Sequence, residues 1–414
     1  MPQIKAPQVR FKGFIEEWEE KKIGDVVDDL YNGQTPSRIV NNYWNGKINW
    51  LSSGELNRSI VTKTIEKISV SGQKSANLRL VPSGTFVIAI TGLEATGTRG
   101  NCAILGIDTT LNQSCMAIYP NLNLLLTSFL FQWYRKNSEE YGIKFTQGTK
   151  QQSYNAAIIK KLDLVLPKVE EQVKIGDYFQ RLDALIEQKE KKYQKLKQFK
   201  IAMLSQMFPK EGECTPKLRF KGFSGEWEEN KLGEYAKFRR GSFPQPYGNK
   251  EWYDGEGSMP FVQVVDVTSN LALVKNTKQK ISLIAQPKSV FVEQGSVVVT
   301  LQGSIGRVAI LQYNAYLDRT LLIFEEFKNA TNTYFWAYII QELFEIEKKK
   351  APGGTIKTIT KDALSSFKIF IPNLIEQTKI GNYFQKLDTL IDLHQKELEK
   401  LKNMKKALLA KMFV

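Results

Sequence analysis

The sequence predicts an α+β fold with a pseudo-two-fold internal duplication: two similar mixed α/β bodies joined by two long helices that pair as an antiparallel coiled coil. Two repeated segments predict this. The pattern Pro-x-x-Arg-Phe-Lys-Gly-Phe occupies residues 7–14 and recurs at 216–223, and the stretch 167–208 recurs, with roughly half of its residues identical, at 372–413. Repetition at a domain-sized period indicates a duplicated unit and not a solenoid.

The second of these repeats predicts a long helix in each half. Its apolar residues are spaced alternately four and three residues apart, which is the period of a coiled coil. The predicted seam consists of Ile175, Phe179, Leu182, Ile186 and Leu196 in the first helix and of Ile380, Phe384, Leu387, Ile391 and Leu401 in the second. Polar residues interrupt both seams at equivalent positions, namely Lys189 and Lys200, His394 and Lys405. Because the seams match, we expect the two helices to pair with each other.

The bodies between these repeats carry both strand and helix signals. The apolar runs 85–90 and 296–301 predict buried strands, and 124–141 and 334–350 predict helices. A proline- and glycine-containing linker separates the halves. We therefore divide the chain into a first body (1–165), a first helix (166–208), a linker (209–219), a second body (220–370) and a second helix (371–414).

Composition limits the class of partner. The 414 residues carry a net charge of +15 that is spread along all segments, and a basic protein attracts polyanions by releasing their counterions. A long polyanionic ligand that touches every segment fits this distribution better than a small acidic substrate. Three cysteines without CxxC spacing and a single histidine exclude an ordinary zinc site. No apolar run is long enough for a bilayer and no secretory leader is evident, so we predict a cytoplasmic protein without membrane contact.

The sequence offers no catalytic motif. It contains no GxxxxGK[ST] loop, no HExxH, no GxSxG and no Asn/Asp-Pro-Pro-aromatic signature of an adenine methyltransferase. The single histidine, His394, lies within a helix seam and is poorly placed for acid–base chemistry. We predict no catalytic residue, no metal ligand and no cofactor on this chain.

Polar and basic loops in both bodies are the candidates for contact with DNA. Arg, Asn and Gln match base edges, whereas Lys and Thr more often hold phosphates. The candidates are Arg38, Asn42, Tyr43, Arg99, Lys144, Gln147, Thr149, Lys150 and Gln151 in the first body and Arg239, Arg240, Gln245, Tyr247, Lys250, Arg307 and Lys357 in the second. Arg99 and Arg307 belong to glycine-containing turns that have two interpretations. The glycines either permit a tight strand connection or bring the backbone close to a phosphate.

The repeated segments resemble the specificity subunit of type I DNA restriction–modification enzymes. The residues that carry the resemblance are the paired openings, with Trp18 and Trp227, and the helix starts Pro-x-x-x-x-Glu-Gln-x-x-Ile at 167–175 and 372–380, each followed by a Leu-Asp pair. The order of bodies and helices resembles this family over the whole chain. Individual residues match the family only in the repeated segments. No base-contacting residue carries over from it.

The resemblance implies two target-recognition domains, each recognising one half of a split, asymmetric DNA sequence, and two helices that hold them a fixed distance apart. It also implies partners: two methyltransferase subunits that bind S-adenosylmethionine, and restriction (motor–nuclease) subunits that use ATP and magnesium. Two other functions stay open at this point. One is a coiled-coil scaffold without sequence-specific DNA binding, and the other is a DNA-modifying enzyme of unfamiliar motif.

Overall fold

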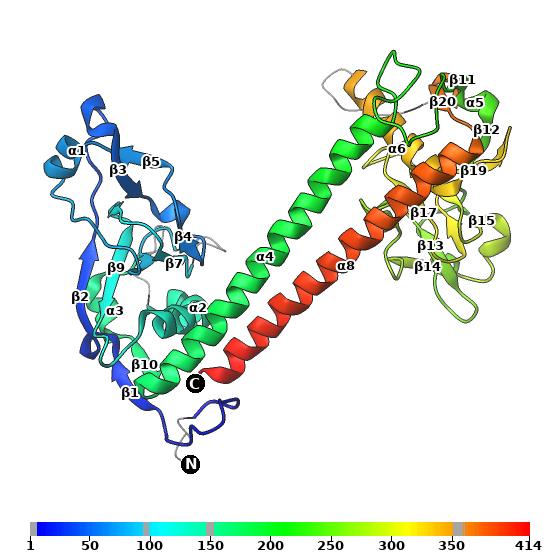
Figure 1. Ribbon diagram of the computed structural model, residues 1–414. Coiled ribbons are helices and arrows are strands. Elements are labelled where there is room, and N and C mark those ends of the chain that lie inside the picture. Colours follow the sequence, from blue (N-terminus) through cyan, green and yellow to red (C-terminus); the bar gives the residue numbers. More distant parts are fainter. Residues whose placement is uncertain (1–5, 94–98, 146–152, 351–358, 360) are drawn as a thin grey trace. The chain divides into compact units, whose positions relative to one another are not determined.

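The computed structural model describes residues 6–93, 99–145, 153–350, 359 and 361–414. The chain divides into two compact units: unit 1 is Met1–Glu190 with Lys396–Val414, and unit 2 is Lys191–Gln395. Each unit thus contains one body and the adjoining parts of the two long helices, α4 and α8 in Figure 1. The predicted duplication and the two long helices are confirmed.

The elements of unit 1 are β1 (Glu19–Lys22), η1 (Ile23–Asp25), β2 (Val27–Asn32), η2 (Asn41–Tyr43), β3 (Trp44–Leu51), η3 (Ser53–Glu55), β4 (Ile60–Val61), β5 (Glu66–Ile68), α1 (Val70–Ser75), β6 (Phe86–Ala89), β7 (Cys102–Leu105), β8 (Thr110–Leu111), β9 (Cys115–Pro120), α2 (Thr127–Phe145), α3 (Ala156–Lys161), β10 (Asp163–Leu166) and the first part of α4 (Val169–Met207). The strands form three sheets of order β2-β9-β6-β7-β4, β5-β3-β8 and β1-β10.

The elements of unit 2 are the rest of α4, β11 (Glu228–Lys231), α5 (Leu232–Tyr235), β12 (Ala236–Arg240), η4 (Lys250–Trp252), β13 (Met259–Val262), η5 (Val264–Asp266), β14 (Gln279–Ile281), η6 (Gln286–Lys288), β15 (Val290–Val292), β16 (Val297–Thr300), β17 (Val308–Ile310), β18 (Ala315–Leu317), β19 (Leu321–Phe327), α6 (Thr333–Lys350), α7 (Lys361–Ser366), β20 (Lys368–Ile371) and the first part of α8 (Leu374–Met412). The end of α8 belongs to unit 1. The sheets are β12-β19-β16-β17, β14-β13-β18-β15 and β11-β20.

The two bodies share one topology. The order β2-β9-β6-β7 in unit 1 corresponds to β12-β19-β16-β17 in unit 2, and β5-β3-β8 corresponds to β14-β13-β18. In both, the strand after the first long loop pairs in parallel with a short strand late in the body, as β3 does with β8 and β13 with β18. The predicted strands lie at the centre of the sheets, since every residue of β6 and of β16 is buried. Parallel pairing between segments so far apart in sequence gives no local signal, and the sequence did not predict it.

A long helix covers the central strands of each body. In unit 1, Phe129, Leu130 and Tyr134 of α2 join the core cluster that contains Phe86 of β6. The helix begins at Thr127, three residues later than predicted, because the preceding residues form turns in which the backbone N–H groups of Leu124 and Leu125 both donate to the carbonyl of Asn121. In unit 2, α6 begins one residue earlier than predicted, at Thr333.

Within each unit, α4 and α8 pack against each other in antiparallel directions. In unit 1, Asp183 of α4 contacts Lys405 of α8, and Glu190, further along α4, contacts Lys402, further back along α8. In unit 2, Lys200 contacts Asp388 at 2.5 Å. All ten predicted seam residues are buried or half-buried: Ile175, Phe179, Leu182, Ile186, Leu196, Ile380, Phe384, Leu387, Ile391 and Leu401. Three of the four polar interruptions of the seam, Lys189, Lys200 and Lys405, are therefore partners in ion pairs, with Lys189 in contact with Glu397 at 2.7 Å.

The repeated opening segment is anchored to the first turn of a long helix in each unit. Arg10 donates to both oxygens of the buried Glu171, and the indole Nε1 of Trp18 donates to the same carboxylate at 3.2 Å. In unit 2, Arg219 binds Glu376 in the same bidentate manner, at 2.8 and 2.7 Å. The Arg and Glu of both repeated segments, and Trp18 of the first, thus have a structural reason for their spacing.

The glutamine that follows this glutamate fixes the chain ahead of the body's long helix. Gln172 donates to the carbonyls of Pro167 and Leu124 and accepts from the N–H of Leu126 at 2.9 Å. Gln377 donates to Pro372 O and accepts from the N–H of Asn332 at 3.0 Å. Each Glu-Gln pair therefore joins a long helix to the body that precedes it.

Candidate nucleic-acid interface

Two long loops at equivalent places carry many of the predicted DNA-contacting residues. The loop after β2 holds Arg38, Asn42 and Tyr43, and the loop after β12 holds Gln245, Tyr247 and Lys250. Both loops start where the chain passes very close to a strand end. A Cβ added to Gly33 would lie 1.9 Å from the carbonyl oxygen of Leu111, and one added to Gly241 would lie 2.2 Å from that of Leu317. Only glycine fits where the chain passes this close to the carbonyl oxygen of a neighbouring strand. Because both loops begin at such a glycine, they start at equivalent positions in the two bodies.

In unit 1, Arg38 is held in a fixed position. Its guanidinium carbon lies 3.7 Å from the ring centre of Trp44, and Nη2 donates to Glu66 at 2.9 Å. The hydrogen bonds between the two side chains raise the pKa of Arg38 and lower that of Glu66. The guanidinium is about half exposed. A phosphate or a base at this surface would have to share Arg38 with a carboxylate, which weakens its net attraction for DNA.

The neighbouring Asn42 and Tyr43 belong to η2. Asn42 is exposed, and its carbonyl accepts from the hydroxyl of Ser69 at 2.6 Å. Tyr43 is half-buried, and its carbonyl accepts from the N–H of Ser69. Their backbones are therefore tied to the segment before α1, while the Asn42 side chain faces solvent.

In unit 2, Tyr247 lies at the edge of an aromatic cluster. Its ring centre is 5.0 Å from that of Phe243, and its hydroxyl donates to the buried Asp318. Burial, followed by this hydrogen bond, raises the pKa of Tyr247 well above its ordinary value, so the hydroxyl keeps its proton. The neighbouring Gln245 and Lys250 are exposed.

The other predicted residues of unit 2 have protein partners. Arg239 forms an ion pair with Glu325 of the adjacent strand β19. Arg240 donates to the carbonyl of Ile359 at 3.2 Å. Arg307 is exposed and donates to the carbonyl of Val267 at 3.4 Å.

The glycine-containing turns before β7 and β17 pack against helices. Gly100 and Gly306 have φ of +72° and +80°, and added Cβ atoms would lie 2.0 Å from Ser138 Oγ and 2.7 Å from Phe344 Cβ. Arg99 is mostly buried and lies 3.6 Å from Glu139 of α2. These contacts favour the interpretation as tight strand connections over the interpretation as phosphate sites. Gly97 lies outside the described residues.

Five further candidates, Gln147, Thr149, Lys150, Gln151 and Lys357, also lie outside the described residues. Lys144 is exposed in the last turn of α2. The sequence did not predict Gln113 and Arg319, two exposed side chains that lie beside the two long loops. The repeat itself was the available signal, because Leu-Asn-Gln-Ser and Leu-Asp-Arg-Thr follow equivalent strands.

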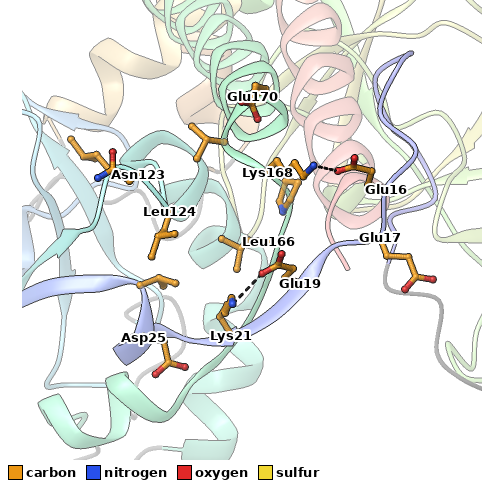
Figure 2. A pocket seen from close by; sticks show the side chains of 14 residues that line it. Glu16, Glu17, Glu19, Lys21, Asp25, Asn123, Leu124, Leu166, Lys168 and Glu170 are labelled. Atoms are coloured by element: carbon orange, nitrogen blue, oxygen red, sulfur yellow. Dashed lines mark ion pairs between the residues drawn. The ribbon is translucent and has the colours of Figure 1, made fainter.

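The pocket of unit 1 between β1 and the start of α4 has the wrong charge for DNA. It has a volume of about 630 Å³, and five carboxylates, those of Glu16, Glu17, Glu19, Asp25 and Glu170, line it together with two lysines. Figure 2 shows that each lysine pairs with one of the carboxylates, Lys168 with Glu16 at 2.7 Å and Lys21 with Glu19 at 3.1 Å. The remaining negative charge repels phosphates.

Two features that would indicate another kind of site are not present in the described part of the chain. No helix there is long and apolar enough to cross a membrane. No group of three or more His, Cys, Asp or Glu side chains there is arranged to hold a metal ion.

Comparison with known proteins gives one family. The model of the "Type I restriction modification DNA specificity domain" matches residues 15–198 and again residues 224–403. The type I restriction enzyme MjaIX specificity subunit of Methanocaldococcus jannaschii is 23% identical, over 96% of this chain and 92% of its own length. Among solved structures, the S subunit of a type I restriction–modification system from M. genitalium superposes with a TM-score of 0.65 at 15% identity, over 99% of both chains. A chain from a study of complex assembly in the type I system gives a TM-score of 0.55 at 18% identity, over 96% of this chain and 97% of that one.

Proposed function

This chain belongs to the type I restriction–modification DNA specificity family, and from this premise we propose that it recognises a bipartite, asymmetric DNA sequence for a type I restriction–modification complex. One observation carries the proposal. The two bodies share their strand order and their anchoring to the helices, whereas the loops after β2 and β12 differ in length and sequence. Two bodies of one design with different loops suit two different half-sites in one duplex.

We propose that the chemistry resides on partner subunits. Two methyltransferase subunits with S-adenosylmethionine would modify a base, and restriction subunits would use ATP and magnesium. A base must leave the stack before an enzyme can modify it, so a subunit that places the methyltransferase beside its target is needed. The thiols of Cys102 and Cys115 are buried, and burial raises the pKa of Cys102 to about 12, so it offers no thiolate near neutral pH.

Because the substrate is DNA, we expect the complex to act in the cytoplasm.

The test is reconstitution with the methyltransferase subunits that accompany this chain. We expect genomic DNA from cells that make this complex to be modified at one motif with two defined parts and an undefined spacer. Cells that make the methyltransferase subunits alone are the control and should show no such motif. Modification at a single uninterrupted motif, or none that depends on this chain, would contradict the proposal.

Salt dependence separates this function from a scaffold role. A protein that neutralises several phosphates loses affinity steeply as salt rises, by about 10³- to 10⁵-fold between 50 and 200 mM for six to ten contacts. We expect the complex to show such a slope on DNA with the motif. The purified chain with S-adenosylmethionine should methylate nothing, whereas methylation by the single chain would favour an enzyme of unfamiliar motif.

A further inference from the structure

The turn between β8 and β9 and the turn between β18 and β19 are built in the same way. In unit 1 the N–H of Cys115 donates to the carbonyl of Asn112 at 3.1 Å, and in unit 2 the N–H of Leu321 donates to that of Asp318 at 3.0 Å. Both turns are fastened to the neighbouring parallel strand. Asn112 N donates to Leu51 O at 2.9 Å, and Asp318 N donates to Val262 O at 3.0 Å.

The first side chain of each turn fixes the turn further. The Oδ1 atom of Asn112 accepts from the N–H of Ser114 at 3.1 Å, and Oδ1 of Asp318 accepts from the N–H of Thr320 at 2.9 Å. This is the Asx arrangement, in which a short polar side chain imitates a backbone turn. Each turn is therefore a rigid support whose second residue points away from the core.

That second residue is Gln113 in unit 1 and Arg319 in unit 2, and both are exposed. Each contacts the long loop that carries the predicted DNA-contacting residues. The hydroxyl of Thr35 donates to the side-chain amide oxygen Oε1 of Gln113, and the guanidinium of Arg319 lies 5.4 Å from the ring centre of Tyr247. The two residues thus occupy one structural position beside one kind of loop.

Both side chains keep the hydrogen-bonding capacity that a base would need. The one group already in use, Oε1 of Gln113, accepts a single hydrogen bond from Thr35 and has a second lone pair. Arg319 forms no ion pair with any residue in the described part of the chain, in contrast to Arg38 and Arg239. The amide nitrogen of Gln113 likewise donates to no described residue. A guanidinium without a carboxylate partner is not neutralised before it meets DNA.

We infer that this turn position determines base specificity in both bodies, with Gln113 recognising an adenine in one half-site and Arg319 a guanine in the other. The chemistry follows from the side chains. An amide binds N6 and N7 of adenine with two hydrogen bonds, and a guanidinium binds O6 and N7 of guanine with two. The inference rests on the proposed function, and it adds which residues recognise bases and which bases they recognise.

Reciprocal substitution tests the inference in the complete methyltransferase complex, with methylated sites mapped by sequencing. We expect Arg319→Gln to change the preference at one base pair of one half-site from guanine towards adenine. Gln113→Arg should make the opposite change in the other half-site. Each change should alter discrimination at its base pair by on the order of 10- to 100-fold. The half-site that the substituted body does not contact should stay as it was.

Two further variants show whether the effect depends on the geometry of the guanidinium. Arg319→Lys keeps the charge but loses the planar fork, so it should weaken the guanine preference at the same base pair without creating a preference for adenine. Arg181→Ala removes another exposed arginine, on α4, that forms no ion pair with a described residue. This variant should leave both half-sites unchanged.

The outcomes that would overturn the inference are distinct from failure of the proposed function. If the wild-type complex modifies a two-part motif and both reciprocal variants keep every base preference, the inference is wrong and the function stands. A shift in both half-sites from one substitution would also overturn it. If Arg319→Gln abolishes methylation, selection of bound sites from random oligonucleotides measures the preference without turnover, and an unchanged guanine there contradicts the inference. A wild-type complex that modifies no two-part motif removes the premise and the inference together.

Discussion

Arg10 and Arg219 hold the opening segment of each half against a buried carboxylate. The side chains of Glu171 and Glu376 are only 2% and 1% exposed, so neither could stay ionised at low cost without its arginine. The two sites differ in one donor. The indole of Trp18 also donates to Glu171, whereas the Trp227 indole N–H has no hydrogen-bond partner in the described part of unit 2.

This difference predicts unequal effects of removing the two arginines. Truncating one partner of a buried ion pair costs about 3–5 kcal/mol, because the other charge is left buried. Arg219→Ala should lower the free energy of unfolding by an amount near the upper end of this range. Arg10→Ala should lower it by less, because Trp18 still donates to Glu171. Thermal and denaturant unfolding of the two variants measures both costs, with Lys217→Ala as an exposed control in the same segment. Equal costs for the two arginines would show that the Trp18 bond contributes nothing.

Residue chemistry alone predicted only part of the candidate interface. Arginine chemistry points to Arg38 and Arg239 as contacts for bases and phosphates, but each pairs with a carboxylate on a strand distant in sequence, Glu66 on β5 and Glu325 on β19. Such partners are distant in sequence and leave no local pattern. Gln113 and Arg319 lie in short turns without charge clustering, and the four-residue similarity of these turns is too short a signal until the two halves are compared strand by strand.

At the scale of elements, the Leu-Asp pair of each long helix joins three helices. Leu182 and Leu387 are buried in the seam, and the following aspartates accept from both the opposite helix and the body. Asp183 accepts from Lys405 of α8 and from Arg135 of α2 at 2.8 Å. Asp388 pairs with Lys200 of α4 and accepts from the hydroxyl of Tyr338 on α6. A buried polar pair within a helix seam favours one register over others.

The two junctions have different charge balances. Asp183 faces two cations, whereas Asp388 faces one cation and a neutral phenol. Burial, and then repulsion by Arg135, lower the pKa of Lys405 to about 8, although Asp183 acts in the opposite direction. The charge on Lys405 is therefore buried at a net cost near neutral pH.

This imbalance predicts that Lys405→Met stabilises the protein at pH 7. Lys405 loses its proton near pH 8 in the folded protein, whereas in the unfolded chain it keeps the ordinary lysine pKa of 10.5. Between these values the unfolded state binds more protons, so wild-type stability rises with pH across this window and is lowest below about pH 8. This lowering of the Lys405 pKa corresponds to ~3 kcal/mol of folding free energy lost below pH 8. The advantage of the variant should be full at pH 7 and should shrink by pH 10.5, as chemical denaturation at several pH values can show.

The equivalent substitution in unit 2 is the matched control. Among the described residues, Lys200→Met leaves the Tyr338 hydroxyl as the one partner of Asp388, so it should destabilise the protein by about 1–3 kcal/mol. Opposite signs for the two variants would support the difference in charge balance. Destabilisation by both would indicate that the Lys405 ion pair contributes more than its burial costs.

Elements with local periodicity were the ones that the sequence predicted well. The 3.5-residue spacing located α4 and α8 nearly to their ends, because each turn of such a helix contributes its own seam residue. The sheet order was not predicted, since strands such as β3 and β8 pair across about sixty residues. The Leu-Asp and Glu-Gln motifs were visible as repeats, but their partners on α2 and α6 emerged only from the folded chain.

At the scale of the whole molecule, the repeated topology predicts independent recognition by the two bodies. Each body has its own core clusters and its own anchoring glutamate on a long helix. No core cluster of the described residues combines side chains of both bodies. The modules should therefore be exchangeable.

Replacement of residues 1–165 with the first body of another family member tests this independence. The chimaera should recognise one new half-site and keep the other, because the second body and both helices are unchanged. Mapping methylated sites for the chimaera and the wild-type complex measures the outcome. A donor body that retains the counterparts of Arg10 and Arg135 keeps the contacts with Glu171 and Asp183 and so controls for poor docking. Simultaneous change of both half-sites would contradict independent recognition.

The last prediction concerns the spacer between the half-sites, which we expect the paired helices to set. One heptad inserted after Lys192 in α4 and one after Gln395 in α8 lengthen both helices between the same contacts. The Lys189–Glu397 and Asp183–Lys405 pairs then stay together in unit 1, and the Lys200–Asp388 pair stays together in unit 2. A control with both heptads shuffled to polar residues keeps the length but removes the added seam.

Seven residues add about 10.5 Å of helix. Since DNA rises about 34 Å per ten base pairs, the preferred spacer should lengthen by about three base pairs. Those base pairs also turn one half-site by about 100° around the duplex, a rotation that lengthened helices do not reproduce by themselves. The DNA must then twist or bend, so affinity should fall even at the new optimal spacer. Selection from a library of spacers by the lengthened complex measures both effects. If the optimal spacer is the same as in the wild-type complex, the helices do not determine the separation of the half-sites, and the bodies themselves must do so through their contacts with DNA.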